Sequence, residues 1–168
     1  MKPTFLSSDE VTSEAIREMD RYWNSLRGAG IIPRKADLWP GDMKQLLPNV
    51  MLADIERKPF RVRFRLVGTK VVDATGFDFT GRYLDEIALP HDIGPFLRCY
   101  RIAAFTRRPA ASRVIWYLKG GDRAEYDLGV WPLSNGGETV DTVIALECYA
   151  NLEKHAGWYH RTPRRWQL

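Results

Sequence analysis

The amino-acid sequence predicts an α+β fold, in which a mainly antiparallel sheet carries helices over one face and follows an N-terminal amphipathic helix. Three observations support this prediction. Residues 60–66 alternate between apolar side chains and arginine, as a strand with one buried face does. Residues 114–148 hold further alternating runs separated by glycine-rich turns. Residues 11–26 instead repeat apolar side chains every three or four positions, which is the spacing of an amphipathic helix.

The N-terminal helix is expected over residues 9–27. Ser7 and Glu10 have the spacing of a capping box, and Gly28 follows the last apolar position. The apolar stripe of this helix can cover the core of its own domain or pair with another helix, and its sequence fits both. We expect it to contact a second copy of the chain or a protein partner through Val11, Ala15, Met19, Tyr22 and Leu26.

The middle of the chain alternates strands with short helices. Two strands and two short helices are expected in sequence order, at 50–55, 60–66, 68–76 and 83–87. The second strand places Arg61, Arg63 and Arg65 on a face that water reaches. Asp92 can cap a longer helix, which Pro109 ends and which should lie across the sheet.

Three consecutive strands are expected to close the domain, with turns at 120–122 and 134–137. Strands joined in this way are antiparallel. On the middle one, Glu125 and Asp127 should pair with the arginines of residues 60–66 if the two strands are neighbours. The last strand has five alternating residues that we expect to face inward, namely Val140, Thr142, Ile144, Leu146 and Cys148.

Length and composition indicate one folded domain. The chain has 168 residues, of which 45% are hydrophobic and 27% charged, close to the globular average. We divide it into a helical extension (1–30), the α+β domain (31–150) and a basic tail (151–168). The net charge is +4, but the arginines are scattered among acidic residues rather than forming a stripe, which makes nucleic acid an unlikely partner.

The sequence shows no sign of secretion, membrane insertion or a metal site. The N-terminus lacks the apolar core of a signal peptide, and no apolar stretch is long enough to cross a bilayer. We therefore expect a cytoplasmic protein without membrane contact. Cys99 and Cys148 lack metal-ligand spacing and form no disulfide framework, so we interpret both as buried free thiols.

Several short stretches of the sequence resemble the PAS_5 family of bacterial PAS domains. They are Arg21-Tyr22-Trp23 with Leu26-Arg27, Ile32-Pro33-Arg34, Leu46-Leu47-Pro48-Asn49-Val50, Phe64-Arg65-Leu66-Val67-Gly68-Thr69 and Thr80-Gly81-Arg82. The resemblance spans roughly residues 18–148 and implies a five-stranded antiparallel sheet with helices packed over one face. It also implies a sensory or interaction module in signal transduction, which acts through protein partners or as a homodimer.

PAS domains variously bind haem, flavin, organic ligands or only proteins, so the resemblance leaves the cofactor unknown. Haem needs an axial ligand, and the three histidines are His91, at a helix start, and His155 and His160, beyond the last strand. The light-sensing flavin class carries an Asn-Cys-Arg-Phe-Leu-Gln signature, whereas Cys99 here follows Leu97-Arg98. On these grounds we expect both haem and flavin to be disfavoured.

Catalytic candidates are few. His91 with Asp92, and Glu125 with Asp127, are the nearest approach to paired acid and base groups. Helix capping by Asp92 and ion pairing by the two strand carboxylates explain them without catalysis. The sequence has no nucleophile elbow, phosphate loop or metal-ligand spacing. We therefore expect no enzymatic activity.

A small apolar ligand could lie against the sheet, since such sites are lined by aromatic and aliphatic side chains. Our candidates for its lining are Phe64, Leu66, Val72, Phe79, Tyr100, Trp116 and Tyr126. Two alternatives remain open. One is a small-molecule enzyme on a cone-like α+β fold, which a buried carboxylate with a raised pKa would favour. The other is a nucleic-acid adaptor that uses the arginine face and the basic tail.

Overall fold

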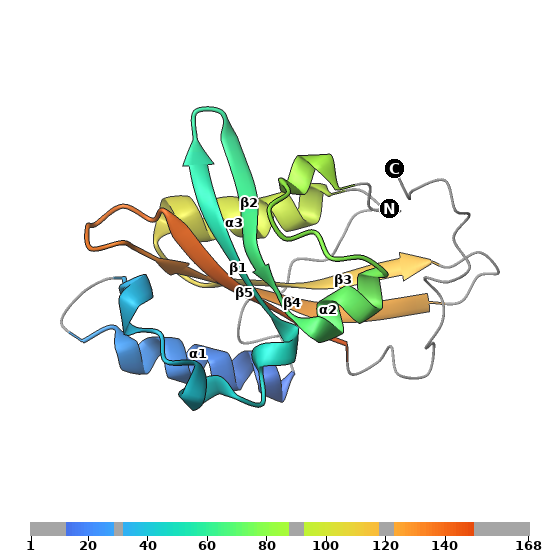
Figure 1. The fold of residues 1–168 in the computed structure, drawn as a ribbon, viewed down its shortest axis with the longest axis horizontal. Coiled ribbons are helices and arrows are strands. Elements are labelled where there is room, and N and C mark those ends of the chain that lie inside the picture. The colour runs from blue at the N-terminus through green and yellow to red at the C-terminus, as the bar shows by residue number, and fades with distance from the viewer. Residues whose placement is uncertain (1–12, 29–31, 88–92, 118–122, 150–168) are drawn as a thin grey trace.

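The computed structural model describes residues 13–28, 32–87, 93–117 and 123–149. Short 3₁₀ turns connect the main elements. In chain order these elements are α1 (Glu14–Leu26), β1 (Val50–Arg57), β2 (Phe60–Val67), α2 (Thr69–Thr75), α3 (Gly94–Thr106), β3 (Ala110–Tyr117), β4 (Arg123–Leu133) and β5 (Thr142–Cys148) (Figure 1). The expected succession of strands and helices is thus present.

The five strands form one antiparallel sheet in the order β2-β1-β5-β4-β3. The first and last strands, β1 and β5, lie side by side in its middle. This confirms the predicted five-stranded antiparallel sheet with helices. No helix in the described parts of the chain has the length and apolar character needed to cross a bilayer.

Helices cover both faces of the sheet (Figure 1). We call the face toward α2 and α3 the inner face and the face toward α1 the outer face. Met51, Phe64 and Ala145 belong to the core on the inner face. Ile144 and Leu146 belong to a separate core on the outer face. β5 is therefore buried on both sides, which is why its sequence is almost continuously apolar.

α1 packs on the outer face through Ile16, Met19 and Trp23, each of which is buried. Burying each of these side chains contributes about 1.5–3 kcal/mol. Two indole hydrogen bonds fix the helix on the sheet: Trp23 Nε1 donates to the Pro132 carbonyl at 2.8 Å, and Trp131 Nε1 donates to an Asp20 carboxylate oxygen at 3.0 Å.

The structure corrects two details of the sequence analysis here. α1 begins at Glu14, after Ser13, and the expected cap residues Ser7 and Glu10 lie outside the described residues. On β5, Ile144 and Leu146 face α1 rather than the inner core. Alternation along a strand buried on both sides does not reveal which set of residues faces which helix.

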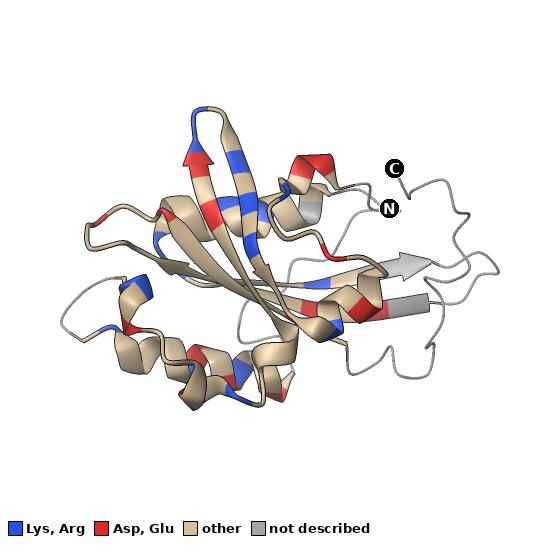
Figure 2. Cartoon of the chain, in the orientation of Figure 1, with Lys and Arg blue, Asp and Glu red and all other residues tan. Residues whose placement is uncertain are grey.

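The arginines of β2 lie near acidic residues in the fold (Figure 2), and acidic side chains and a tyrosine ring contact them. Arg61 Nη2 donates to Asp85 and to Glu86, each at 2.9 Å, and holds the pKa of both carboxyls below the ordinary range. Arg65 pairs with Asp54 across the hairpin. Such pairing speaks against a bare arginine face for nucleic acid.

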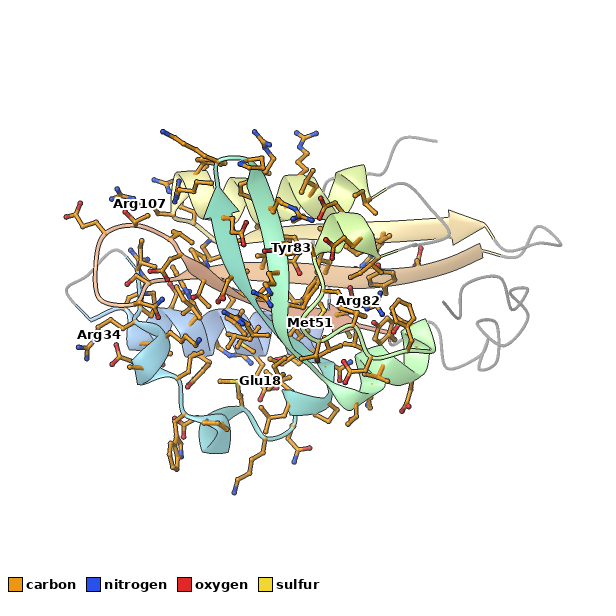
Figure 3. The ribbon with its side chains drawn as sticks, turned by 45° about the horizontal axis from the view of Figure 1, so that its top comes forward. Glu18, Arg34, Met51, Arg82, Tyr83 and Arg107 are labelled. Carbon is orange, nitrogen blue, oxygen red and sulfur yellow. The ribbon has the colours of Figure 1, made fainter. Side chains whose placement is uncertain are left out.

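Tyr83 lies beside β2 (Figure 3) and forms an antiparallel bridge with Arg63. The Arg61 guanidinium lies 3.6 Å from the centre of its ring, a cation–π geometry. The Tyr83 hydroxyl donates to Glu56 at 2.6 Å, and this bond raises the pKa of the phenol.

The predicted pairing of the β2 arginines with Glu125 and Asp127 is wrong. β1 and β5 separate β2 from β4, so the two strands are not neighbours. Asp127 instead accepts a hydrogen bond from Arg113 Nε of β3 at 2.8 Å. The two groups occupy cross-strand positions on the outer face.

Candidate functional site

An aromatic cluster lies between the inner face and the helices that cover it. The Phe64 ring on β2 packs edge-on against Phe79, with ring centres 4.7 Å apart, and against Tyr100 of α3, with ring centres 6.2 Å apart. All three side chains are buried. Edge-to-face aromatic pairs add about 0.5–1.5 kcal/mol beyond the area they bury. These rings form the first half of the cluster.

The second half of the cluster lies over β4 and the end of β5. Tyr126 of β4 packs against Phe96 of α3 at 6.1 Å and against Tyr149 at 5.3 Å between ring centres. Tyr149 directly follows β5 and is half-buried, whereas Tyr126 and Phe96 are buried. The cluster thus runs from β2 across the inner face to the C-terminal end of the sheet.

A single carboxylate, Glu147, lies within this apolar surface. It follows Val143 and Ala145 on the inward side of β5 and is only 6% exposed. Its cross-strand neighbour is the buried Leu128 of β4. The Tyr149 hydroxyl donates a hydrogen bond to it. Burial raises the pKa of Glu147 to about 7, although the bond from Tyr149 acts in the opposite direction.

Two further titratable groups of the cluster are neutral at physiological pH. Burial raises the pKa of the Tyr100 phenol well above its ordinary value, and the nearby Glu147 and Cys99 raise it further. Burial also raises the pKa of the Cys99 thiol to about 12, which the charge of Arg98 opposes. Cys99 is thus an unreactive core thiol, because the thiolate is the nucleophilic form.

Sequence reasoning did not identify Glu147. Its neighbours Ile144, Leu146 and Cys148 were expected to face inward, which implied that Glu147 pointed to water. The signal that could have placed it is the run Val143 to Leu146, because four consecutive apolar residues indicate a strand buried on both faces. On such a strand, a side chain lies against a core whichever face it points to.

The structure brings four of the seven predicted pocket residues together on the inner face, namely Phe64, Phe79, Tyr100 and Tyr126. Val72 is only half-buried, because α2 turns the preceding residue, Val71, toward the core. The side chain of Trp116, on β3, lies outside the described residues.

Leu66 is not part of the inner face, because its side chain is 47% exposed. The register between β1 and β2 shifts by one residue at this point: Ala53 pairs with Phe64, but Leu52 pairs with Leu66. The extra residue, Arg65, is a β-bulge, and a bulge reverses the inward and outward alternation beyond it. The inclusion of Leu66 in the pocket was therefore wrong.

Among the described residues, the other predicted site residues do not form a second centre. Asp127 and Glu125 lie on the outer face of β4. His91, Asp92, His155 and His160 lie outside the described residues. Among the residues that the structure describes, no group of three or more histidine, cysteine, aspartate or glutamate side chains could hold a metal ion.

The predicted contact stripe of α1 divides between its own core and the surface. Met19 is fully buried against the sheet, so a role for it in binding a second copy is excluded while α1 stays in place. Ala15, Tyr22 and Leu26 are half-buried. The Tyr22 hydroxyl accepts a hydrogen bond from the backbone amide of Trp39 at 2.8 Å. Val11 lies outside the described residues.

Comparison with known proteins identifies the family. The model of PAS_5, a PAS domain, matches residues 11–143, which is most of the chain and includes α1. This chain belongs to the PAS_5 family. The match confirms the resemblance seen in the sequence. PAS domains are generally sensory signalling modules. No curated protein matches the sequence of this PAS domain.

The PAS domain is also similar to solved structures of light-oxygen-voltage domains. One, studied with a flavin analogue, has a TM-score of 0.48 and 17% identity, and the match covers 71% of this chain and 90% of that one. The light state of the Aureochrome1 domain has a TM-score of 0.46 and 11% identity, with 74% and 99% covered. Its dark state has a TM-score of 0.48 and 12% identity, with 68% and 85% covered.

These neighbours correct one expectation. The prediction that flavin is disfavoured is contradicted by this comparison, because the three solved structures above are light-oxygen-voltage domains, one of them studied with a flavin analogue. The prediction relied on a missing signature around Cys99. A short motif reports on one chromophore chemistry and leaves open what else the same fold accommodates.

Proposed function

We propose that this PAS domain is a sensory and interaction module, in which a change on the inner face of the sheet alters the surface that α1 presents to a protein partner or to a second copy. The observation that carries the proposal is the double burial of β5. Val143, Ala145 and Glu147 face the aromatic cluster, while Ile144 and Leu146 face α1. Because packed cores transmit strain, a shift of this strand acts on both sides at once.

The proposed contact surface is the outward side of α1 and the connector beside it. Trp39, which is 67% exposed, is anchored to α1 through its backbone hydrogen bond with Tyr22. An exposed tryptophan on a fixed backbone is the kind of residue that contributes most to protein interfaces. Leu26 extends the same side of α1 and is half-buried.

Size-exclusion chromatography with light scattering tests the contact with a second copy. We expect the protein to show a concentration-dependent dimer mass, and Trp39→Ala to weaken the dimer at least tenfold. Phe105→Ala is the matched control, because Phe105 is a 52% exposed aromatic at the end of α3, on the inner side of the sheet. A monomer at every concentration, or equal effects of both substitutions, would exclude the dimer.

We further propose that the inner face responds to a flat, largely apolar ligand. The rings of Phe64, Phe79, Tyr100 and Tyr126 gather on the inner face and are buried, so such a molecule would displace part of their packing to stack on them. Native mass spectrometry and an absorbance spectrum of the purified protein test this. A bound mass or a flavin-like or haem-like spectrum supports a ligand, whereas a clean apo mass after gentle purification contradicts it.

Glu147 favours a second candidate function, acid–base chemistry on a small molecule. The cone-like fold expected for that alternative is not the fold of this chain, but its diagnostic feature is present: a buried carboxyl whose pKa is raised to about 7, suited to a general base. Deuterium exchange from solvent into the α-positions of cyclic ketones tests it. Exchange that Glu147→Gln abolishes would support catalysis, and exchange equal to the buffer rate would remove it.

A further inference from the structure

The side chain of Glu147 has no positively charged partner among the described residues. Its one side-chain hydrogen bond comes from the Tyr149 hydroxyl. Asn49 Nδ2 donates at 2.7 Å to the backbone carbonyl of Glu147, not to its carboxylate. A carboxylate removed from water without a cation is costly to keep charged, and a buried group of this kind usually takes up a proton instead.

The groups that face Glu147 from the surrounding elements supply no compensating charge. From α3 come the Tyr100 phenol and the Cys99 thiol, and burial keeps both neutral by raising their pKa values. From β4 comes Leu128, with Tyr126 diagonal to it. On β5 itself, Ala145 precedes Glu147 on the same face. The cation nearest in sequence on α3 is Arg98, which is exposed.

The described residues around the Glu147 carboxylate differ in burial. Leu128 and Tyr100 are buried and close the deep side of the cluster. Tyr149 is half-buried, stands just beyond the end of β5, and is held by its bond to Glu147 and by its ring contact with Tyr126. Among these described neighbours of Glu147, Tyr149 is therefore the least buried and lies nearest the end of the strand.

We propose that Glu147 is a proton-binding switch, in which loss of its proton strengthens the bond from the Tyr149 hydroxyl and uptake of the proton weakens it. A change in the hold on Tyr149 acts on its ring contact with Tyr126, which packs on Phe96 of α3. The charge of one buried side chain thereby changes the packing between the sheet and its covering helix. As a signalling input, this proton depends on the sensory function proposed above.

Carbon-13 NMR of the glutamate side-chain carboxyls tests the switch on the full chain. Spectra are recorded from about pH 3 to about pH 9, with Glu147→Gln assigning the Glu147 signal and Glu14→Gln assigning a matched exposed one. Glu14 should titrate below the ordinary glutamate range, because Arg21 and Arg17 lower its pKa. Glu147 should titrate near neutral pH, and the ring signals of Tyr149 should move with the same midpoint.

Tyr149→Phe gives a second, independent arm of the test. Its hydroxyl stabilises the charged carboxylate, so its removal should move the Glu147 midpoint to higher pH. This arm decides the matter if Glu147→Gln does not fold. The switch is overturned if Glu147 titrates with the ordinary glutamates, if Tyr149 does not respond at the Glu147 midpoint, or if Tyr149→Phe leaves that midpoint unchanged.

The titration needs neither a partner nor a dimer, so it separates the switch from the proposed function. If Glu147 has no near-neutral midpoint, the switch is excluded, and the light-scattering result for the proposed function is unaffected. If Glu147 titrates as expected but the chain binds no partner and no second copy, the sensory function is excluded and the switch is not.

Discussion

Gly129 on β4 lies where Trp131 and Ile16 of α1 leave no room for a side chain. An added Cβ would lie 2.2 Å from the Cη2 atom of Trp131 and 2.9 Å from the Cδ1 atom of Ile16. Ile16 can rotate, but the Trp131 ring is fully buried and is held by its hydrogen bond to Asp20. Gly129→Ala must therefore displace the ring, and overpacking of this kind costs about 1–3 kcal/mol. Loss of the indole bond adds about 0.5–1.5 kcal/mol.

Urea unfolding followed by tryptophan fluorescence measures this cost. We expect Gly129→Ala to lower the free energy of unfolding by about 1.5–4.5 kcal/mol, as the sum of the two contributions. Gly137→Ala is the control, because the nearest atom to its added Cβ is 4.0 Å away, and it should stay within about 0.5 kcal/mol of the wild type. If Gly129→Ala were as stable as this control, α1 would not pack on the sheet through Trp131 as described.

Two further predictions concern charge. The pKa of Glu147 is about 7 in the folded chain against 4.5 for a free glutamate, so between these values the folded state holds a proton that the unfolded state has lost. The free energy of unfolding should therefore fall by about 3 kcal/mol as the pH rises through this window. Urea titrations of Glu147→Gln should show no such fall. Arg113→Ala leaves the buried carboxylate of Asp127 without its 2.8 Å partner and should lower the free energy of unfolding by about 1–3 kcal/mol in thermal or urea unfolding. Arg34→Ala is the control: it breaks an exposed pair with Asp37 and should lower that free energy by about 0–1 kcal/mol. Equal effects of the two substitutions would contradict the difference in burial.

Most of the fold could be predicted from the sequence because its signals are local. Alternation between apolar residues and arginine defined β2, and glycines marked the turns before β4 and β5. Gly76 ends α2 in the left-handed conformation, with φ of 79°, that glycine adopts without strain. Strand order was harder to predict, because the place of β5 between β1 and β4 depends on contacts distant in sequence. Without the strand order, the sequence analysis assigned the wrong partners to Asp127.

The candidate site was predicted less completely, for two physical reasons. The bulge at Arg65 reversed the direction of Leu66, and an inserted residue leaves no mark in an otherwise regular alternation. Glu147 was missed because its strand is buried on both sides, where polarity is the usual guide to the exposed face. A charged residue in such a strand looks like a surface residue until the second covering element, here α1, is known to be present.

The free-energy cost of burying the Glu147 carboxyl is itself an argument for its function. A glutamine of the same shape could fill this position without a charge to desolvate, and replacing a buried charged group by a neutral one of similar volume is often stabilising. Above pH 7 the folded chain must either keep the carboxylate charged or rearrange around it, and both lower stability. A position that lowers stability within an otherwise apolar core, next to the half-buried Tyr149 at the end of β5, is where a conformational input is expected. Stability and response should therefore separate in Glu147→Gln: it should be more stable than the wild type above neutral pH, and Tyr149 should no longer respond to pH.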